Sequence, residues 1–345
     1  MSYRYIGNKT RLLPLLIPAL RELVPVGARV ADIMCGTASV AESLRLHGFR
    51  VVASDVMTYA AHHARVRLLL DRAPDFCGLG GRHYLDVLHE LHELTPVEGY
   101  IFREYSPDGK PDGGQAPRCY FTPCNATRID AIRVRLLEWE TSGQLAPLES
   151  ALLRHDLVLA ANKVANIAGT YGHFRSTWSD TTRRAFGLVP SRFFAGYSTD
   201  HAVLQGHAEE LAPQIEADLC YIDPPYMKRQ YAANYHLLET LARGDEPEAV
   251  GVSGLRPWRD QYSDFCSKLK IREAFAAIIE PMACDQFLIS YSEDGLLSLD
   301  DLRDLLSQWG KTTVQTFRYP RFRSNDSELG SHVTEYLFHL SKGTF

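Results

Sequence analysis

Short apolar runs alternate with helix-spaced apolar patterns at the start of the chain. The runs at 28–34 and 49–54 predict buried strands, and the segment at 37–47 between them predicts a helix. Helical spacing also predicts an amphipathic helix over 10–23 and another helix over 56–72. This order is typical of a strand–helix–strand unit in a largely parallel sheet.

The same alternation returns in the C-terminal third. Helical spacing predicts helices at 234–243 and 264–280, and Ser298 with Asp301 forms a capping-box pattern before a further helix. The last two apolar segments flank a polar loop, which predicts a closing strand pair. The strands predicted in this region lie at 218–223, 286–291, 312–319 and 333–340.

The middle of the chain breaks this alternation. Residues 77–126 are rich in Gly, Pro, His and aromatic residues, and 170–200 has no regular period. Helices are predicted at 125–140, with Asn125 as a candidate N-cap, and at 150–168.

A structureless insertion of this length would be unusual in a compact domain, so we expect a folded subdomain. We place an α/β core at 1–72 and 205–345 and the inserted subdomain at 73–204. With 345 residues, of which 45% are hydrophobic, the chain can bury a sizeable core.

Charge and cysteine usage narrow the class of protein. A net charge of -5 means that any basic nucleic-acid-binding surface must be local. The seven cysteines include no CxxC pair, which predicts reduced thiols and no metal site. The stretch LLPLLIPAL is interrupted by prolines, and nothing reaches the about 20 apolar residues that span a bilayer. We expect a cytoplasmic protein with no membrane partner.

Candidate chemistry begins in the stretch DIMCGTAS. Asp32 lies at the end of a predicted strand and Gly36 in the turn that follows, where doubly wound sheets bind ligands. Asp55 ends the next strand, a position where an acid would accept hydrogen bonds from ribose hydroxyls. Ala38 and Ala41 make the glycine series incomplete, which suits a nucleoside cofactor better than a dinucleotide. An ordinary strand-to-helix turn remains an alternative.

The stretch YIDPPY places Asp223, Pro224 and Tyr226 at the end of a second strand. This set suits transfer to an exocyclic amine, whose lone pair is delocalised into a base. The Asp223 carboxylate and the Pro224 carbonyl could accept the two amine hydrogens, because proline fixes φ and so aims the carbonyl. Tyr226 would offer a face on which an extruded base can stack. A plain turn after the strand is the alternative reading.

Four motifs in this order, RYIGNK (4–9), DIMCGTAS (32–39), ASDV (53–56) and YIDPPY (221–226), resemble the Dam-type alpha group of S-adenosylmethionine-dependent DNA adenine methyltransferases. The chain is similar in particular to the type II restriction–modification members of that group. The resemblance covers nearly the whole chain. It implies a Rossmann-like methyltransferase fold, a mostly parallel sheet with a C-terminal antiparallel hairpin, and it makes 73–204 a target-recognition subdomain.

The resemblance also implies roles for single residues. Tyr5 and Lys9 match the motif that meets the methionine end of S-adenosylmethionine, and Asp32 with Gly36 matches the glycine-turn motif. Asp55 matches the ribose-binding acid. The segment 223–226 matches the catalytic motif, with Asp223 also beside the cofactor.

The implied reaction is methylation of a flipped adenine in duplex DNA. It would protect host DNA, with a restriction endonuclease that acts on the same site as a partner, not necessarily in complex.

Three positions depart from the pattern. Met34 stands where the family often has Phe, and Ala38 stands where it often has Gly. His207 stands where relatives commonly carry an acid, which puts one contact to the adenine ring in doubt. Glu209 or Glu210 are candidates to replace that acid.

Basic residues interleaved with aromatics are candidates for contacts to DNA phosphates and bases. One cluster lies in 169–194, a second beside the catalytic motif and a third in the loop of the last strand pair. We select Arg175, Arg183, Arg184, Lys228, Arg229 and Arg321. Scattered solvated arginines are the alternative.

Other functions remain open on the residues alone. An RNA adenine methyltransferase would share the motifs, although the long insertion favours DNA. A cytosine-amine methyltransferase would usually carry Ser, and a glutamine-modifying enzyme Asn, in place of Asp223. A non-catalytic DNA-binding subunit of the same fold is disfavoured by the intact Asp223 and Lys9, and a nicotinamide oxidoreductase by the broken glycine series.

Overall fold

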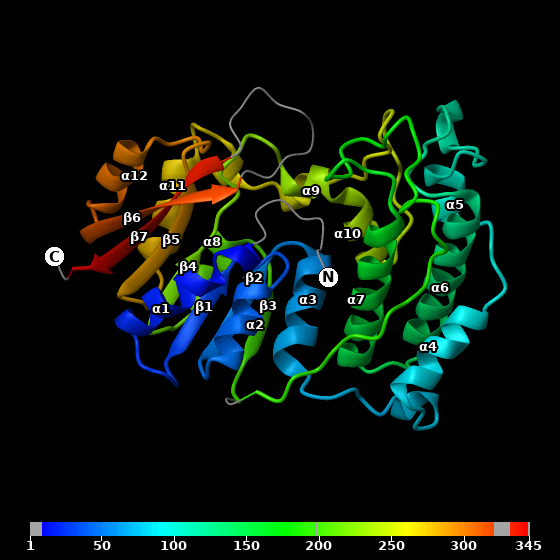
Figure 1. Cartoon of the computed structure of the whole chain (residues 1–345), viewed down its shortest axis with the longest axis horizontal. Coiled ribbons are helices and arrows are strands. Elements are labelled where there is room, and N and C mark those ends of the chain that lie inside the picture. The colour runs from blue at the N-terminus through cyan, green and yellow to red at the C-terminus, as the bar shows by residue number, and fades with distance from the viewer. Residues whose placement is uncertain (1–8, 197–198, 321–331, 344–345) are drawn as a thin grey trace. The chain divides into compact units, whose positions relative to one another are not determined.

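The computed structural model describes residues 9–196, 199–320 and 332–343, without the side chains of 319 and 320. The chain divides into two compact units (Figure 1). One, the sheet unit, comprises Gly7–Leu69, Ala195–Tyr231 and Gln261–Phe345. The other, the helical unit, contains Leu70–Phe194 and Ala232–Asp260.

The sheet unit is built on one sheet with the strand order β3-β2-β1-β4-β5-β7-β6. The pairs β3–β2, β2–β1, β1–β4 and β4–β5 are parallel, whereas β7 runs antiparallel to both β5 and β6. This confirms the α/β class, a mostly parallel sheet with a C-terminal antiparallel hairpin. The strands are β1 (Arg29–Ile33), β2 (Arg50–Asp55), β3 (Ala202–Gln205), β4 (Leu219–Ile222), β5 (Gln286–Ser292), β6 (Gly310–Pro320) and β7 (His332–Lys342).

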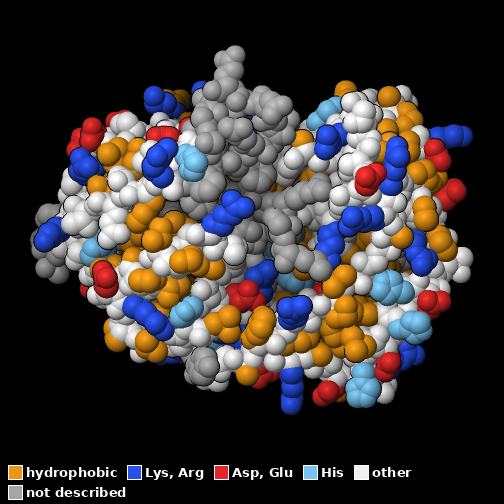
Figure 2. All heavy atoms as spheres, viewed as in Figure 1, with side chains coloured by type: hydrophobic (Ala, Val, Ile, Leu, Met, Phe, Trp, Pro, Cys, Tyr) orange, Lys and Arg blue, Asp and Glu red, His pale blue; other side chains and the backbone are white. Residues whose placement is uncertain are grey.

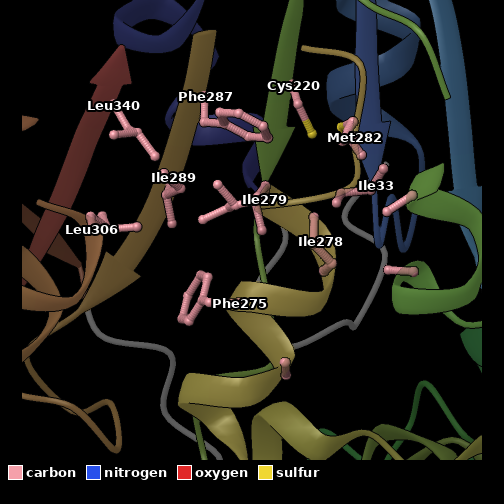
Figure 3. Close-up of a cluster of buried hydrophobic side chains, with 14 of the residues drawn as sticks. Ile33, Cys220, Phe275, Ile278, Ile279, Met282, Phe287, Ile289, Leu306 and Leu340 are labelled. Atoms are coloured by element: carbon pink, nitrogen blue, oxygen red, sulfur yellow. The ribbon is translucent and has the colours of Figure 1, made fainter. Parts of the chain in front are cut away.

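Helices cover both faces of this sheet, which explains why its central strands are continuous apolar runs rather than alternating ones. On one face α1, α2 and α3 pack Leu16, Leu20, Leu44 and Leu68 against the strands. On the other face the strands pack against side chains of α8, α11 and α12 (Figure 3). The helices are α1 (Leu13–Leu23), α2 (Ser39–Leu46), α3 (Thr58–Leu69), α8 (Ala208–Leu211), α11 (Ile271–Ile279) and α12 (Leu299–Leu306).

The ends of these elements follow local chemistry. The predicted capping box is confirmed at α12, where Ser298 Oγ accepts from the Asp301 N–H at 3.1 Å and Asp301 Oδ2 accepts from the Ser298 N–H at 3.4 Å. Strand β3 was not predicted from the sequence. It is a short edge strand with partly exposed side chains, so it carries no apolar run.

The helical unit consists of helices joined by long loops. The helices are α4 (Tyr84–Glu93), α5 (Tyr100–Tyr105), α6 (Pro123–Thr141), α7 (Pro147–Val164) and α10 (His236–Arg243), and the short α9 (Tyr231–Asn234) begins at the boundary of the unit. Buried arginines tie the segment after α10 to these helices. Arg118, with no exposed surface, donates to the Ala249 and Gly251 carbonyls at 3.1 and 3.0 Å and pairs with Glu104 at 2.7 Å.

Several expectations for this region were wrong. Helix α6 begins two residues before Asn125, and its N-cap is Thr122, whose hydroxyl accepts from the Asn125 N–H at 3.3 Å. Asn125 is instead buried, and its side chain bonds the Arg184 carbonyl and the Phe186 N–H. Helices α4 and α5 were not predicted, because loops rich in Gly and Pro surround them.

The two units also have boundaries that differ from those we drew on the sequence. Ala232–Asp260 lies in the helical unit, although the sequence placed it in the core. Residues from Ala195 onward lie in the sheet unit, which therefore begins again before 205. The role of 73–204 in target recognition stays a prediction.

Candidate active site

The candidate site lies at the carboxyl ends of the parallel strands of the sheet unit. Neighbouring strands align Asp55 of β2 with Gln205 of β3, and Ile33 of β1 with Ile222 of β4. The next residues along the chain are therefore brought to one edge of the sheet. Between β1 and β4 the strand order reverses, and in open α/β sheets ligands bind at such a switch point.

The turn after β1 has an unusual backbone. Met34, Gly36 and Ala38 have φ values of 60°, 52° and 56°, in the left-handed region that favours glycine. Two of the three are not glycine, so the turn holds strain that the surrounding contacts must offset. It curls the chain tightly between β1 and α2.

Asp55 holds this turn in place. Its Oδ2 accepts from the Gly36 N–H at 2.8 Å, and its Oδ1 accepts from the Met57 N–H at 2.8 Å. The structure thus brings together two of the predicted cofactor-binding residues. A carboxylate offers about four acceptor positions, so these two bonds do not exclude ligand hydroxyls.

Asp32 is the last but one residue of β1, and it is almost completely buried. Its Oδ2 has no hydrogen-bond partner among the described residues. Burial raises the pKa of Asp32 well above its usual value, and the negative charge of Asp223 raises it further. A buried polar atom without a partner is costly unless a ligand or water satisfies it, so Asp32 fits a ligand-binding role.

The segment 223–226 follows β4 directly, and its backbone is anchored. The Tyr226 carbonyl accepts from the Leu296 N–H at 3.0 Å, and the Tyr226 ring packs against Tyr291 at a centroid distance of 5.6 Å. Pro224 is buried, whereas the Asp223 side chain is 17% exposed. Asp223 can therefore be reached while the residues that follow it are held.

Lys9 is the cation of the site. Its Nζ lies 3.2 Å from Asp223 Oδ1, 3.6 Å from Glu335 Oε2 and 5.5 Å from the centroid of the Tyr226 ring. Burial alone would lower the pKa of Lys9, but Asp223, Tyr226 and Glu335 outweigh it and raise that pKa well above its usual value. Lys9 is therefore an ammonium at any pH near neutrality.

The pKa of Asp223 is also set by burial and by its charged neighbour. Burial raises the pKa of the Asp223 carboxyl, and the Lys9 ammonium partly offsets this. The result is a carboxylate that is more basic than an ordinary surface Asp. It is suited to accept hydrogen bonds from an incoming donor.

Glu335 was missed by the sequence reasoning. It lies in β7, where it faces Ser292 of β5 in the strand register. The signal was present, because an acid inside the apolar run VTEYLFHL is unusual for a buried strand. Only the tertiary structure shows that this acid meets Lys9.

The positions that depart from the family pattern lie in the same sheet unit. His207 immediately precedes α8, and its neighbour Gly206 donates its N–H to the Asp55 carbonyl at 3.1 Å. Glu209 is partly buried, and burial raises its pKa, whereas Glu210 is exposed. His207 therefore follows directly after a backbone hydrogen bond to Asp55, and its effect on an adenine-ring contact stays a prediction.

The predicted DNA contacts lie on both units. Arg175, Arg183 and Arg184 are exposed on the helical unit, and Lys228 and Arg229 are exposed on the sheet unit. In Figure 2 Lys and Arg side chains occur among acidic and apolar ones across the visible face. Tyr5 and Arg321 lie outside the described residues.

The loop that carries Lys228 and Arg229 is anchored on both sides. Tyr226 bonds Leu296 on one side, and Gln230 exchanges two hydrogen bonds with the Ser263 backbone, of 2.8 and 2.9 Å, on the other. The two basic side chains are thus exposed on a loop that directly follows the segment 223–226.

The described residues contain no cluster of His, Cys, Asp and Glu that could hold a metal ion. Within the same part of the chain, no helix is long and apolar enough to cross a membrane. The geometry provides a strained glycine turn, a buried acid with an unsatisfied oxygen and an accessible basic carboxylate beside an ammonium. These groups could hold a nucleoside cofactor and an amine substrate.

Comparison with known proteins agrees with this chemistry. Residues 5–305 match the model of a family described as "D12 class N6 adenine-specific DNA methyltransferase". The chain is 32% identical to the type II methyltransferase M.FokI of Planomicrobium okeanokoites, over 98% of this chain and 52% of that protein.

Two further relatives are the modification methylase LlaI of Lactococcus lactis subsp. lactis and the type II methyltransferase M.NlaIII of Neisseria lactamica. The chain is 30% identical to LlaI, over 98% of this chain and 55% of that protein. It is also 30% identical to M.NlaIII, over 99% of both. The chain thus spans about half the length of M.FokI and LlaI and nearly all of M.NlaIII.

Proposed function

Because the chain belongs to the D12 class of N6 adenine-specific DNA methyltransferases, we propose that it methylates the exocyclic amine of adenine in duplex DNA, with S-adenosylmethionine as the cofactor. Membership of this class confirms the resemblance of the sequence motifs. The observation that carries the proposal is the accessible Asp223 carboxylate, held beside Lys9 at the carboxyl ends of the parallel strands.

In this proposal the side chains act on the amine. The Asp223 carboxylate and the Pro224 carbonyl accept the two amine hydrogens, which draws the nitrogen toward tetrahedral geometry and localises its lone pair. S-adenosylmethionine, when bound, would supply a methyl group on a sulfonium, which would leave as a neutral thioether when its S–C bond breaks and the new N–C bond forms. Asp223 stabilises the positive charge that develops on the nitrogen, and its carboxylate is the base that can take the proton that the nitrogen then loses.

The adenine must leave the duplex to reach Asp223, because its amine is paired in the stack. Tyr226 offers a ring on which the flipped base stacks. One side of this ring already carries the Lys9 ammonium, 5.5 Å from its centroid.

We assign cofactor contacts to Tyr5, Lys9, Asp32, Gly36 and Asp55, together with Asp223. The support is chemical: the Asp32 oxygen without a partner, the left-handed turn at Gly36, and the acceptor capacity of Asp55.

DNA contacts fall to the basic residues on the two units, with 73–204 reading the target sequence. The biological role we propose is protection of DNA within a restriction–modification system in the cytoplasm. A cognate endonuclease is the expected counterpart.

The test is methyl transfer by the purified protein from tritiated S-adenosylmethionine to duplex DNA. Digestion of the DNA to nucleosides should recover the label as N6-methyl-2′-deoxyadenosine, and Asp223→Ala should lose transfer while it still binds DNA. Label in cytosine, in RNA only, or near-normal transfer by Asp223→Ala would overturn the proposal. Mapping of methylated adenines in a methylation-free bacterium would then identify the target sequence.

A further inference from the structure

Glu335 is an acid that the proposed reaction does not yet use. It is 5% exposed, on a strand whose neighbouring positions are mostly apolar. Its Oε2 lies 3.6 Å from Lys9 Nζ, and the same ammonium lies 3.2 Å from Asp223 Oδ1. One buried cation therefore lies between the accessible Asp223 carboxylate and the buried Glu335 carboxylate.

The strand register fixes where Glu335 lies. It faces Ser292 in β5 and Phe317 in β6, so it occupies the middle strand of the C-terminal part of the sheet. Next to it, the Thr334 carbonyl accepts from the Glu293 N–H at 2.9 Å. An acid on a paired central strand is a rigid support, whereas Lys9 sits on a short helical turn with a long flexible side chain.

A lysine paired with Asp223 alone would be less suited to catalysis in two ways. Its four-carbon stem would leave the ammonium free to move, and its full charge would hold the Asp223 carboxylate and compete with the substrate amine. A second acceptor on another strand removes both, because it fixes the ammonium and shares its charge. The distances of 3.2 and 3.6 Å fit such sharing.

We propose that Glu335 is a positioning residue of this site: it fixes the Lys9 ammonium and thereby sets the orientation and the basicity of the Asp223 carboxylate. The expected change in kcat rests on the proposed methyl transfer. The effect of Glu335 on Lys9 does not depend on that reaction.

The kinetic test compares Glu335→Gln with Glu335→Ala, and Glu216→Gln serves as the control because Glu216 is an exposed acid of the same unit. Gln keeps an oxygen where Oε2 lies, 3.6 Å from Lys9 Nζ, so kcat should stay within about threefold of normal. Without the negative charge of Glu335, the Lys9 ammonium interacts with Asp223 alone and lowers the pKa of the Asp223 carboxyl. The acid limb of kcat/KM should therefore move to lower pH. Ala removes the acceptor, and kcat should fall about tenfold to a hundredfold, with KM for DNA little changed.

A purely structural role for Glu335 predicts a different pattern. Both variants would then lose folded protein and activity together, and the acid limb would stay where it is. That result, or near-normal kcat in Glu335→Ala, would overturn the proposal. If Glu335→Ala does not fold by circular dichroism, the acid limb of Glu335→Gln decides.

A second measurement does not depend on methyl transfer. NMR of protein carrying 13C in its lysine side chains follows the loss of the Lys9 proton with pH and needs no reagent to reach the buried amine, with the exposed Lys311 as an internal reference. Removal of Glu335 should shift the Lys9 titration to lower pH and leave that of Lys311 unchanged. Absence of methyl transfer in the unaltered protein would refute the proposed function alone, whereas an unshifted Lys9 titration would refute the role of Glu335.

Discussion

Arg118 is the buried cation whose loss should most damage the helical unit. Its Nη1 pairs with Glu104 Oε2 at 2.7 Å and bonds the Glu104 carbonyl at 3.1 Å, while Nη2 holds the carbonyls of Ala249 and Gly251. Replacement by Ala would leave the Glu104 carboxylate, with a 2% exposed side chain, without its main counter-ion. It would also release two carbonyls of the segment after α10.

Removing one partner of a buried ion pair costs about 3–5 kcal/mol. For a unit of this size we therefore expect Arg118→Ala to lower the Tm of the helical unit by about 6–20 °C. Differential scanning calorimetry measures the shift, and hydrogen exchange should rise first in the peptides that contain 249–251.

Two controls separate the buried charge from general damage. Arg82→Ala, which removes an exposed ion pair with Glu90 in the same unit, should leave the Tm nearly unchanged. Arg118→Met combined with Glu104→Gln removes both charges and should be less destabilising than Arg118→Ala alone. A small Tm shift in Arg118→Ala, or a double variant that is worse than the single one, would refute this reasoning.

Three further predictions concern single carboxylates. Burial raises the pKa of Asp223, and the reaction needs its ionised form, so kcat/KM should fall with decreasing pH at a higher pH than an ordinary Asp would give; a pH–rate profile with no such limb would contradict this. Asp55→Ala should raise KM for S-adenosylmethionine and leave KM for DNA unchanged, because the Gly36 N–H loses its acceptor. Titration of the protein with the cofactor in a calorimeter checks this. Asp285→Ala, which removes an acid outside the site, is the control. Burial raises the pKa of Asp156 to about 7, so the folded state holds a proton that the unfolded chain releases. Unfolding free energy should therefore fall as pH rises from about 4 to about 7, and Asp156→Asn should flatten that slope in urea melts.

The sequence was most informative where burial dominates. The buried runs of β1, β2, β4 and β5 and the capping box of Ser298 predicted elements that the structure confirms, because parallel strands must be apolar and caps need particular side chains. The left-handed φ of Met34 and Ala38 could not be predicted, since neither residue favours that conformation.

The helical unit was harder for a different reason. Its core combines buried aliphatic residues with buried arginines, tyrosines and acids. Helix α5, for example, reads YIFREY, and its Glu104 is as buried as its Ile101. A pattern of apolar positions is hard to recognise in a six-residue helix that buries an acid among its apolar side chains.

Within the site, Asp32, Asp55, Lys9 and Asp223 were predicted from motifs, and the structure brings Gly36 to Asp55 and Lys9 to Asp223. Glu335 follows Asp223 by more than a hundred positions, on a strand whose register no local pattern specifies. Such a contact depends on the whole sheet and could only be seen once it had formed.

That contact has a consequence for the order in which the protein can mature. Lys9 precedes Asp223 by more than two hundred positions, and Glu335, in β7, follows Asp223 by more than a hundred. During synthesis Lys9 cannot pair with the Glu335 carboxylate until β7 has left the ribosome and paired with β5. Such long-range strand pairing is slow to form. A nascent chain that already holds the glycine turn is therefore still an incomplete site, and chains released before β7 should lack the Lys9–Glu335 pair.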